Sequence, residues 1–385
     1  TNWTVAHPPS IELAEKIASL APEGMNKVYF TSGGSESVEA AWKMAVQWQQ
    51  ANGHERRRKV IARRNAYHGV TMGALSFTGI PVCRTPFDPL GIPTVHVGNT
   101  SNYHRPEGET EAEFCAALLA EVEATIEFED PSTIAMMIAE PVQNAGGCLM
   151  PPDGYWQGLR KICDEHDILL CSDEVICAYG RIGTWFGGQK FGYVPDLVTF
   201  AKGLTGAHFS MGGVLMSDKV AEPFFDGRAD YNNGYTFGGH PVGSAVALKS
   251  LEILERENVL ENVNSNAPVA EEALKSLLDI PIVGQIRGTG HFWAIEVVRD
   301  RETKEPFKGK AAEHLFKNVL SEALWHRGLL CRLDDRADPI IQIAPPLVAE
   351  PELFTEIAGI LREGLEITVE QAGAIAPAES SISPI

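Results

Sequence analysis

Two charged side chains stand at the ends of apolar runs of similar character. Asp173 closes the run Ile168-Leu-Leu-Cys-Ser-Asp173, and Lys202 follows Leu197-Val-Thr-Phe-Ala. Each run is typical of a buried strand in a parallel sheet, which is apolar on both faces. In an open α/β sheet, ligands bind beyond the carboxyl ends of the strands. The two runs therefore predict one site that holds both an amine and a carboxylate.

That pair of groups suits one cofactor, pyridoxal phosphate (PLP). Its aldehyde forms a Schiff base with a lysine, and its ring nitrogen needs an acidic partner. A buried carboxylate is costly unless it faces a cation, and a protonated ring nitrogen is such a cation. A structural salt bridge is the alternative for Asp173, and a solvated surface is the alternative for Lys202. The position of both residues after buried runs favours the cofactor.

A glycine turn, Ser32-Gly-Gly-Ser35, joins a predicted strand at residues 27–31 to a predicted helix at 36–51. Backbone N–H groups at a helix N-terminus bind phosphate, and glycine lets a ligand come close. The turn matches neither the dinucleotide fingerprint G-x-G-x-x-G nor the nucleotide loop G-x-x-x-x-G-K-[ST]. From its residues alone, the segment is either a phosphate-binding turn or a plain turn with a serine N-cap.

Three further residues occupy positions that suit a ligand site. Tyr67 follows a predicted strand and could stack on a planar ring, or it could simply pack. Glu140 follows the apolar run 133–139, and its carboxylate needs a partner if it is buried; a capped loop is the alternative. Thr236 lies in a glycine-rich segment before a predicted helix, where its hydroxyl could bind phosphate or belong to an ordinary loop.

The predicted elements alternate between strand and helix as far as residue 257. Strands are predicted at residues 27–31, 59–63, 133–139, 168–173, 197–201 and 213–217, and helices at 10–20, 36–51, 111–127, 155–166 and 241–257. Such alternation is typical of a mostly parallel sheet with helices on both faces. Beyond residue 262, helices at 266–278 and 310–327 alternate with short strands at 292–298, 329–332 and 340–343.

We therefore expect an α/β fold built from two domains. A large domain occupies residues 1–262, and a smaller α+β domain occupies residues 263–371. Residues 372–385 are rich in Ala, Ser and Pro, and we expect them to form a disordered tail.

Composition excludes several classes of partner. Lys and Arg number 32 against 51 Asp and Glu, and the net charge of −19 argues against nucleic acid or an anionic membrane. The seven cysteines include no C-x-x-C pair, so we expect neither a disulfide framework nor a zinc site, and a cytoplasmic location fits best. No metal motif of the H-E-x-x-H kind is present. No apolar run approaches the length of about 18 residues that a membrane span needs.

In their order and spacing, the motifs resemble those of the class III (subgroup II) aminotransferases of PLP fold type I. The resemblance runs from about Pro8 to Gly364. It is carried by Thr31-Ser-Gly-Gly-Ser-Glu36, Tyr67-His-Gly69, Ala139-Glu-Pro-Val142, Ser172-Asp-Glu-Val175, Phe200-Ala-Lys-Gly203 and Gly234-Tyr-Thr-Phe-Gly-Gly-His-Pro241. It implies a mostly parallel, seven-stranded sheet flanked by helices, a smaller C-terminal domain, and a PLP-dependent transaminase. The family has a further segment before the position of Thr1, so domain 1–262 is expected to lack it.

The resemblance also implies a role for each matching residue. Lys202 would be the Schiff-base lysine, and Asp173 would be the partner of the ring nitrogen. The other cofactor-binding positions would be Gly33, Gly34, Ser35, Tyr67, His68, Gly69, Glu140, Val175 and Thr236. Thr236 would reach the phosphate of the neighbouring subunit, which implies a homodimer, alone or paired into a tetramer. Arg332, or else Arg336, would bind the substrate carboxylate.

One detail narrows the branch of the family. Family members that act on γ-aminobutyrate or ornithine often carry Gln after Asp-Glu-Val, whereas this chain has Ile176-Cys177, as in the ω-amine or β-alanine:pyruvate branch. The resemblance thus implies transfer of an amino group from an ω-amino acid or primary amine to a keto acid, with pyruvate expected, by a ping-pong mechanism. The alternatives are a 2-oxoglutarate-dependent class III enzyme, a PLP aminomutase or decarboxylase, and a non-catalytic PLP-binding protein. Departures from the family at Ala178-Tyr179, Asn144 and residues 206–210 leave the substrate range open.

Overall fold

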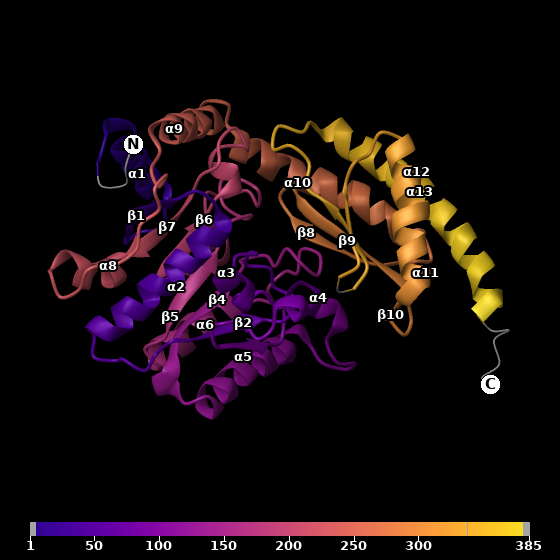
Figure 1. Ribbon diagram of the computed structural model, residues 1–385. Helices are drawn as coiled ribbons and strands as arrows, with labels where there is room; N and C mark the ends of the chain where they lie inside the picture. The colour runs from indigo at the N-terminus through magenta and orange to yellow at the C-terminus, as the bar shows by residue number, and fades with distance from the viewer. Residues whose placement is uncertain (1–4, 337, 380–385) are drawn as a thin grey trace. The chain divides into compact units, whose positions relative to one another are not determined.

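The computed structural model describes residues 5–336 and 338–379, and the chain divides into two compact units (Figure 1). The larger unit comprises Thr1–Asn144 and Met150–Leu260, and the smaller comprises Ala145–Leu149 and Glu261–Ile385. The predicted division after residue 262 lies two residues beyond this boundary. The return of residues 145–149 to the smaller unit was not expected, because the strand and helix pattern shows no break there.

A seven-stranded sheet forms the centre of the larger unit, as expected. Its strand order is β1-β7-β6-β5-β4-β2-β3. The strands are β1 (Met25–Thr31), β2 (Lys59–Arg63), β3 (Thr94–Val97), β4 (Ile134–Ala139), β5 (Leu169–Asp173), β6 (Leu197–Phe200) and β7 (Gly212–Ser217). β7 runs antiparallel to both of its neighbours, while the other adjacent strands pair in parallel. The sheet is therefore mostly parallel, which confirms the expected fold class.

Helices cover both faces of this sheet, and the alternation along β5 shows which side chains face each layer (Figure 1). Leu169 and Cys171 pack in the same apolar cluster as α2 (Gly34–Ala51), whereas Leu170 packs with α5 (Glu111–Phe128) and α6 (Tyr155–Glu165). Successive strand residues point to opposite faces. Asp173, the last residue of β5, therefore extends from the face that α2 covers.

The remaining helices of the larger unit connect and flank these strands. They are α1 (Pro8–Leu20), α3 (Met72–Phe77), α4 (Pro81–Arg84), α7 (Gly187–Phe191), α8 (Asp218–Phe225) and α9 (Pro241–Arg256). Within the described part of the chain, no helix has both the length and the apolar character that a membrane span would require.

The smaller unit is built on an antiparallel sheet of order β10-β9-β12-β11, with β8 paired to β9. Its strands are β8 (Val283–Thr289), β9 (Phe292–Asp300), β10 (Glu305–Pro306), β11 (Arg332–Asp334) and β12 (Ile340–Ile343), and its helices are α10 (Val259–Lys275), α11 (Gly309–Glu313), α12 (Ser321–His326) and α13 (Pro351–Glu379). A π-helical stretch, His314–Leu320, joins α11 to α12. The unit is thus α+β in character.

Two expectations for the smaller unit differ from the structure. The strand predicted at residues 329–332 lies instead at Arg332–Asp334, where three residues pair with β12. The expected disordered tail overlaps α13, which continues to Glu379; residues 380–385 lie outside the described residues. Alanine at every second position from 372 to 378 favours a helix, whereas Gly373 and Pro377 oppose one, so helix propensity alone does not account for this continuation.

Candidate active site

A cavity of about 370 Å³ opens in the larger unit where β5 and β6 end. Ten of the residues predicted for the site line it: Gly33, Gly34, Ser35, Tyr67, His68, Gly69, Glu140, Asp173, Val175 and Lys202. They come from segments far apart in the sequence, and the parallel sheet brings them together because its strands end at one edge. The cavity wall also includes Thr205 and Met211, which the sequence did not single out. Cys177, Phe209 and Ser210 line it as well; the sequence marked them only as signs of the branch or as departures from the family.

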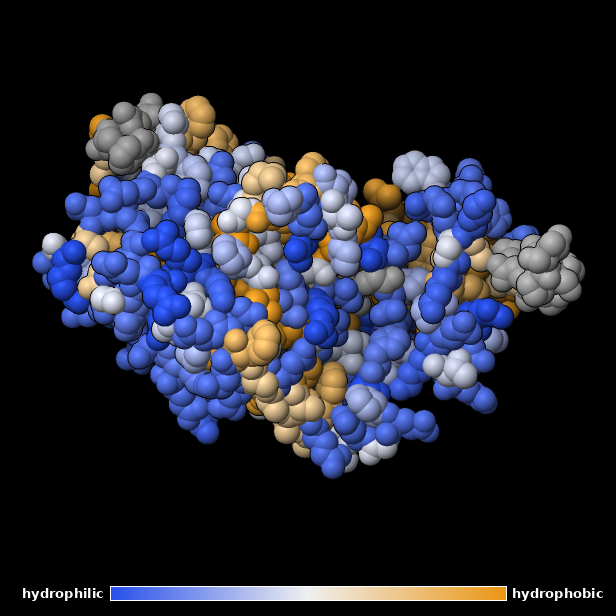
Figure 2. All heavy atoms as spheres, turned by 60° about the horizontal axis from the view of Figure 1, so that its bottom comes forward, coloured by the Kyte–Doolittle hydropathy of each residue, from blue (hydrophilic) through white to orange (hydrophobic). Residues whose placement is uncertain are grey.

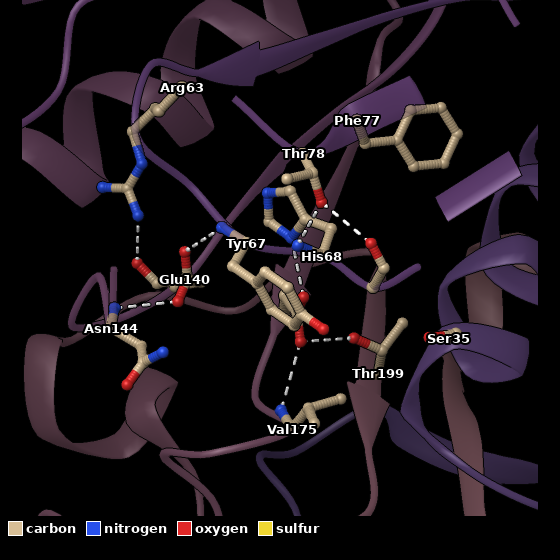
Figure 3. Close-up of polar contacts among 12 residues, drawn as sticks. Ser35, Arg63, Tyr67, His68, Phe77, Thr78, Glu140, Asn144, Val175 and Thr199 are labelled. Carbon is tan, nitrogen blue, oxygen red and sulfur yellow. Dashed lines mark hydrogen bonds and ion pairs between the residues drawn. The ribbon is translucent and has the colours of Figure 1, made fainter. Parts of the chain in front are cut away.

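The carboxylate of Asp173 is buried and held by three donors (Figure 3). Its Oδ1 accepts hydrogen bonds from the Val175 backbone N–H at 3.2 Å and the Thr199 hydroxyl at 3.0 Å. Its Oδ2 lies 2.7 Å from Nδ1 of His68, a side chain that is fully buried. Because a carboxylate only accepts, Nδ1 must carry the proton in this pair. The carboxylate is thus fixed in orientation at the cavity wall.

This arrangement leaves acceptor capacity for a ligand. An ionised carboxylate offers about four lone-pair positions, and the three protein donors take three of them. A further N–H donor that enters the cavity can therefore bind Asp173 without displacing a protein contact. A protonated pyridine nitrogen is such a donor, and its charge offsets the cost of burying the carboxylate. The site thus fits the ring nitrogen of PLP.

Thr199 was missed from the sequence, although it carries a readable signal. It is a polar residue inside the apolar run of β6, and it pairs with Asp173 of β5 in the sheet register. Leu197 packs on the face that α2 covers, so Thr199, two residues on, shares that face. A hydroxyl in a buried strand needs a partner, and here the partner is the Asp173 carboxylate.

Lys202 follows β6 and stands at the start of a short 3₁₀ turn, Lys202–Leu204. Its backbone φ is +33°, which an L-residue other than glycine rarely adopts. Such a conformation persists only where the surrounding structure fixes it, and it is common at functional sites. Lys202 is exposed and lines the cavity, in contrast to the buried Asp173. The structure therefore presents an accessible amine beside a buried acid.

The glycine turn is not the serine-capped turn considered as an alternative. The N-cap residue of α2 is Gly33, which has no side chain to bind the first N–H groups of the helix. A side chain at position 34 would place its Cβ 2.9 Å from Val175, so the approach of this turn to Val175 requires glycine. The uncapped N-terminus of an 18-residue helix attracts anions through its N–H groups and its dipole. These features fit a phosphate.

Glu140 directly follows β4 and is buried. Its Oε2 accepts from the Asn144 backbone N–H at 2.8 Å and its Oε1 from the Tyr67 backbone N–H at 3.4 Å, while Nη2 of Arg63 donates to its carbonyl oxygen at 2.6 Å (Figure 3). Burial raises the pKa of Glu140, and the nearby charges of His68 and Arg63 oppose that rise. The carboxyl group thus caps a loop, as the alternative proposed, and also forms part of the cavity wall.

Glu174 is a second buried carboxyl group, which the sequence did not single out. It points away from Asp173 and accepts from the backbone N–H groups of Gly187 and Gly188 and from the Ser172 hydroxyl. These contacts tie the residue before Val175 to the start of α7. Burial raises the pKa of Glu174 to about 7, although the three donors favour the charged form. The signal available in the sequence was a second acid directly after Asp173, since a carboxylate this close to a buried strand needs donors of its own.

Three predicted residues lie outside this cavity. Thr236 is exposed in the segment between α8 and α9, and it lines a separate hollow with Tyr235 and His240. Arg332 and Arg336 belong to the smaller unit, where both donate to Asp334 at 2.6 Å. A substrate carboxylate that used either arginine would therefore compete with Asp334.

The Glu174 carboxyl group makes the stability of the protein depend on pH. Its pKa rises from 4.5 in the unfolded chain to about 7 in the fold, so its stabilising contribution is complete below pH 4.5 and is lost as the pH rises through 7. Glu174→Gln cannot titrate. We expect the free energy of unfolding of the variant, relative to wild type, to increase by on the order of 3 kcal/mol between pH 4.5 and pH 8.

Urea unfolding of both proteins across this pH range measures that difference. The glutamine amide replaces one carboxylate oxygen acceptor, which lowers the free energy of unfolding by the same amount at every pH. The quantity to compare is therefore the change of the free-energy difference with pH. A difference between the two proteins that does not change with pH would contradict the raised pKa of Glu174.

Known proteins share both the sequence and the fold of this chain. The family model for class III aminotransferases matches residues 2–365. A probable aminotransferase of Mycobacterium tuberculosis is 48% identical over 366 residues, which cover 95% of this chain and 78% of the relative. A putrescine–pyruvate aminotransferase of Pseudomonas aeruginosa is 38% identical over 373 residues, which cover 95% of this chain and 79% of the relative.

Among solved structures, an ω-transaminase from Pseudomonas jessenii in complex with PMP has a TM-score of 0.89 and 36% identity, covering 96% of this chain and 81% of its own. The expected PLP fold type I is therefore confirmed. The chain belongs to the class III aminotransferases, which are enzymes that transfer an amino group with PLP as their cofactor.

Proposed function

We propose that this enzyme transfers the amino group of a primary amine or ω-amino acid to pyruvate, with Lys202 and Asp173 as its catalytic residues. The observation that carries the proposal is the accessible amine of Lys202 beside the buried, oriented carboxylate of Asp173 in one cavity. Among the described residues that line this cavity there is no arginine. Its wall therefore offers no guanidinium to a substrate that carries a carboxylate next to its reacting amino group. The named activity of the Pseudomonas aeruginosa relative supports pyruvate as the acceptor.

Bound PLP supplies an aldehyde that takes up the amino group and a ring that accepts electrons from the substrate carbon. In our proposal, the amine of Lys202 removes a proton from that carbon and delivers it to the cofactor side, acting first as base and then as acid. Asp173 holds a proton on the ring nitrogen by accepting its hydrogen bond. His68 and Thr199 keep the carboxylate in place for that role.

The remaining cavity residues would hold the cofactor. We assign the phosphate to the backbone of Gly33, Gly34 and Ser35 at the start of α2, and the two faces of the ring to Val175 and Tyr67. The proposed cofactor-binding residues also include His68, Gly69 and Glu140, because they line the same cavity. For a donor that carries a carboxylate, Arg332 is the proposed partner and Arg336 the second choice, each in exchange for its contact with Asp334.

We propose that the enzyme is a homodimer, alone or paired into a tetramer, in which Thr236 reaches the phosphate of the neighbouring subunit. Thr236 is exposed in its own chain, as that role requires. Large apolar side chains are exposed next to site residues: Val70 and Met72 follow Gly69, and Phe237 follows Thr236. Figure 2 shows a band of apolar residues across a largely hydrophilic face. Exposed apolar groups of this kind favour contact with a second copy.

A reducing cytoplasm is the proposed location. None of the seven cysteines, all of which lie in the described part of the chain, forms a disulfide, and five of them are buried. Free buried thiols are typical of proteins that fold in a reducing compartment.

Lys202→Ala tests the catalytic assignment. Removal of a general acid–base group lowers rates by about 10²–10⁴-fold, so we expect alanine formation from pyruvate to fall by at least that factor. Lys161→Ala is the matched control, because Lys161 is an exposed lysine on α6 that contacts only Glu165 among the ion pairs of the described residues. The control should keep the wild-type rate, and a Lys202→Ala variant that does the same would refute the role of Lys202.

A panel of amine donors with two keto acids tests the substrate assignment. Wild-type enzyme is assayed with a diamine, an ω-amino acid and an α-amino acid, each with pyruvate and with 2-oxoglutarate. We expect the highest kcat/KM for the diamine or the ω-amino acid with pyruvate. A clear preference for 2-oxoglutarate would overturn the acceptor while leaving the family assignment intact, and a reaction that releases CO₂ without a keto acid would indicate a decarboxylase.

A further inference from the structure

The segment that carries Thr236 is bound along one face of α2. Four residues of this helix make the contacts, and their spacing of four, three and four residues places them on a single face. The Tyr235 hydroxyl donates to the Glu36 carbonyl oxygen at 3.2 Å, the Tyr231 hydroxyl to that of Ala40 at 2.9 Å, Lys43 Nζ to Asn233 Oδ1 at 3.2 Å, and Gln47 Nε2 to the Asp230 carbonyl oxygen at 2.9 Å.

Asn233 is the centre of this contact. Its side-chain nitrogen donates to the hydroxyls of Tyr29 at 3.2 Å and Tyr231 at 3.0 Å, while its side-chain oxygen accepts from Lys43. Since both amide protons are used on tyrosine oxygens, the Tyr231 proton is free to point at the helix, where it binds Ala40. A carboxylate at position 233 could not donate in this way.

Three tyrosines pack around the amide. The ring of Tyr29 lies edge-on to that of Tyr231 with centroids 5.0 Å apart, and to that of Tyr235 at 6.4 Å. Burial raises the pKa of all three hydroxyls and so favours their protonated form. The hydroxyls of Tyr231 and Tyr235 donate to α2, while that of Tyr29 accepts from Asn233. Aromatic pairs in this geometry add to the stability of the contact.

Thr236 depends on this contact for its position. Its side chain makes no hydrogen bond within the described chain, and it directly follows Tyr235, the residue bound to Glu36. α2, in turn, begins at the glycine turn assigned to the phosphate. One helix therefore connects the phosphate turn of a subunit with the Thr236 that the same subunit would lend to its partner.

We propose that Asn233 is a positioning residue that, through Tyr231, Tyr235 and α2, holds Thr236 where it binds the cofactor phosphate of the neighbouring subunit. This inference rests on the proposed shared site. In this proposal Asn233 does not contact the cofactor, so a substitution of Asn233 changes cofactor binding only through Thr236. A substitution of Asn233 should therefore weaken the binding only of ligands that carry a phosphate.

A double-mutant cycle on the full-length holoenzyme tests this inference. The rate of cofactor release is measured for wild type, Asn233→Ala, Thr236→Ala and the double variant. Loss of one hydrogen bond to a charged group corresponds to about a tenfold change, so we expect Thr236→Ala to release PLP about tenfold faster and Asn233→Ala somewhat less than that. The double variant should match Thr236→Ala alone, because Asn233 acts through Thr236.

Pyridoxal, which lacks the phosphate, separates positioning from general damage. Enzyme loaded with pyridoxal should release it at the same rate in all four proteins. Asn232→Ala is the matched control, since Asn232 is exposed in the same loop and its side chain binds only the Asp230 carbonyl within the described chain. It should release PLP at the wild-type rate. If Asn233→Ala does not fold, Tyr235→Phe replaces it, because that change removes only the hydroxyl bound to Glu36.

The outcomes separate this inference from the proposed function. Additive effects in the double variant, or equal acceleration of pyridoxal release, would overturn the role of Asn233 while leaving Thr236 in place. An unchanged release rate for Thr236→Ala would overturn the shared phosphate site and this inference with it. The transaminase assignment would stand in either case, because it is tested independently through Lys202.

Discussion

The arrangement of the site depends on how the buried carboxylate of Asp173 is stabilised. A charged group in a low-dielectric interior is stable only when donors and a cation compensate for its lost hydration. Here three donors from different segments, at Val175, Thr199 and His68, converge on its two oxygens. The parallel sheet makes this convergence possible by ending β5 and β6 at one edge. Asp173 also lines the cavity, and the acceptor capacity that these three donors leave suits a protonated nitrogen.

The two adjacent acids at the end of β5 have different surroundings. Asp173 faces the α2 layer and the cavity, whereas Glu174 faces the opposite layer and binds the start of α7. Val175, one residue on, returns to the cavity. In this three-residue segment, Asp173 and Val175 line the cavity, and Glu174 between them binds the start of α7. The two acids thus differ in their partners, Asp173 at the end of β5 and Glu174 in the segment that follows it.

Much of the larger unit could be predicted from the sequence, because buried parallel strands produce apolar runs with sharp polar ends. The apolar runs before Asp173 and Lys202 predicted that both residues share one site, and both line the same cavity. The strand β2 has its predicted bounds. Features that depend on tertiary contacts were not predictable in this way. Thr199 and Glu174 acquire their roles from neighbours distant in sequence, and residues 145–149 join the smaller unit without a local signal. The helix α13 continues to Glu379 through a segment whose composition predicts a coil.

The most direct test of the central claim is the protonation state of the nitrogen that Asp173 is proposed to hold. Holoenzyme reconstituted with PLP carrying ¹⁵N in its ring can be measured by NMR at neutral pH, with Asp173→Asn as the comparison. The account predicts a protonated ring nitrogen in the wild type and an unprotonated one in the variant, which cannot stabilise the positive charge. An unprotonated nitrogen in the wild type would contradict the account, since the buried carboxylate would then lack its cation.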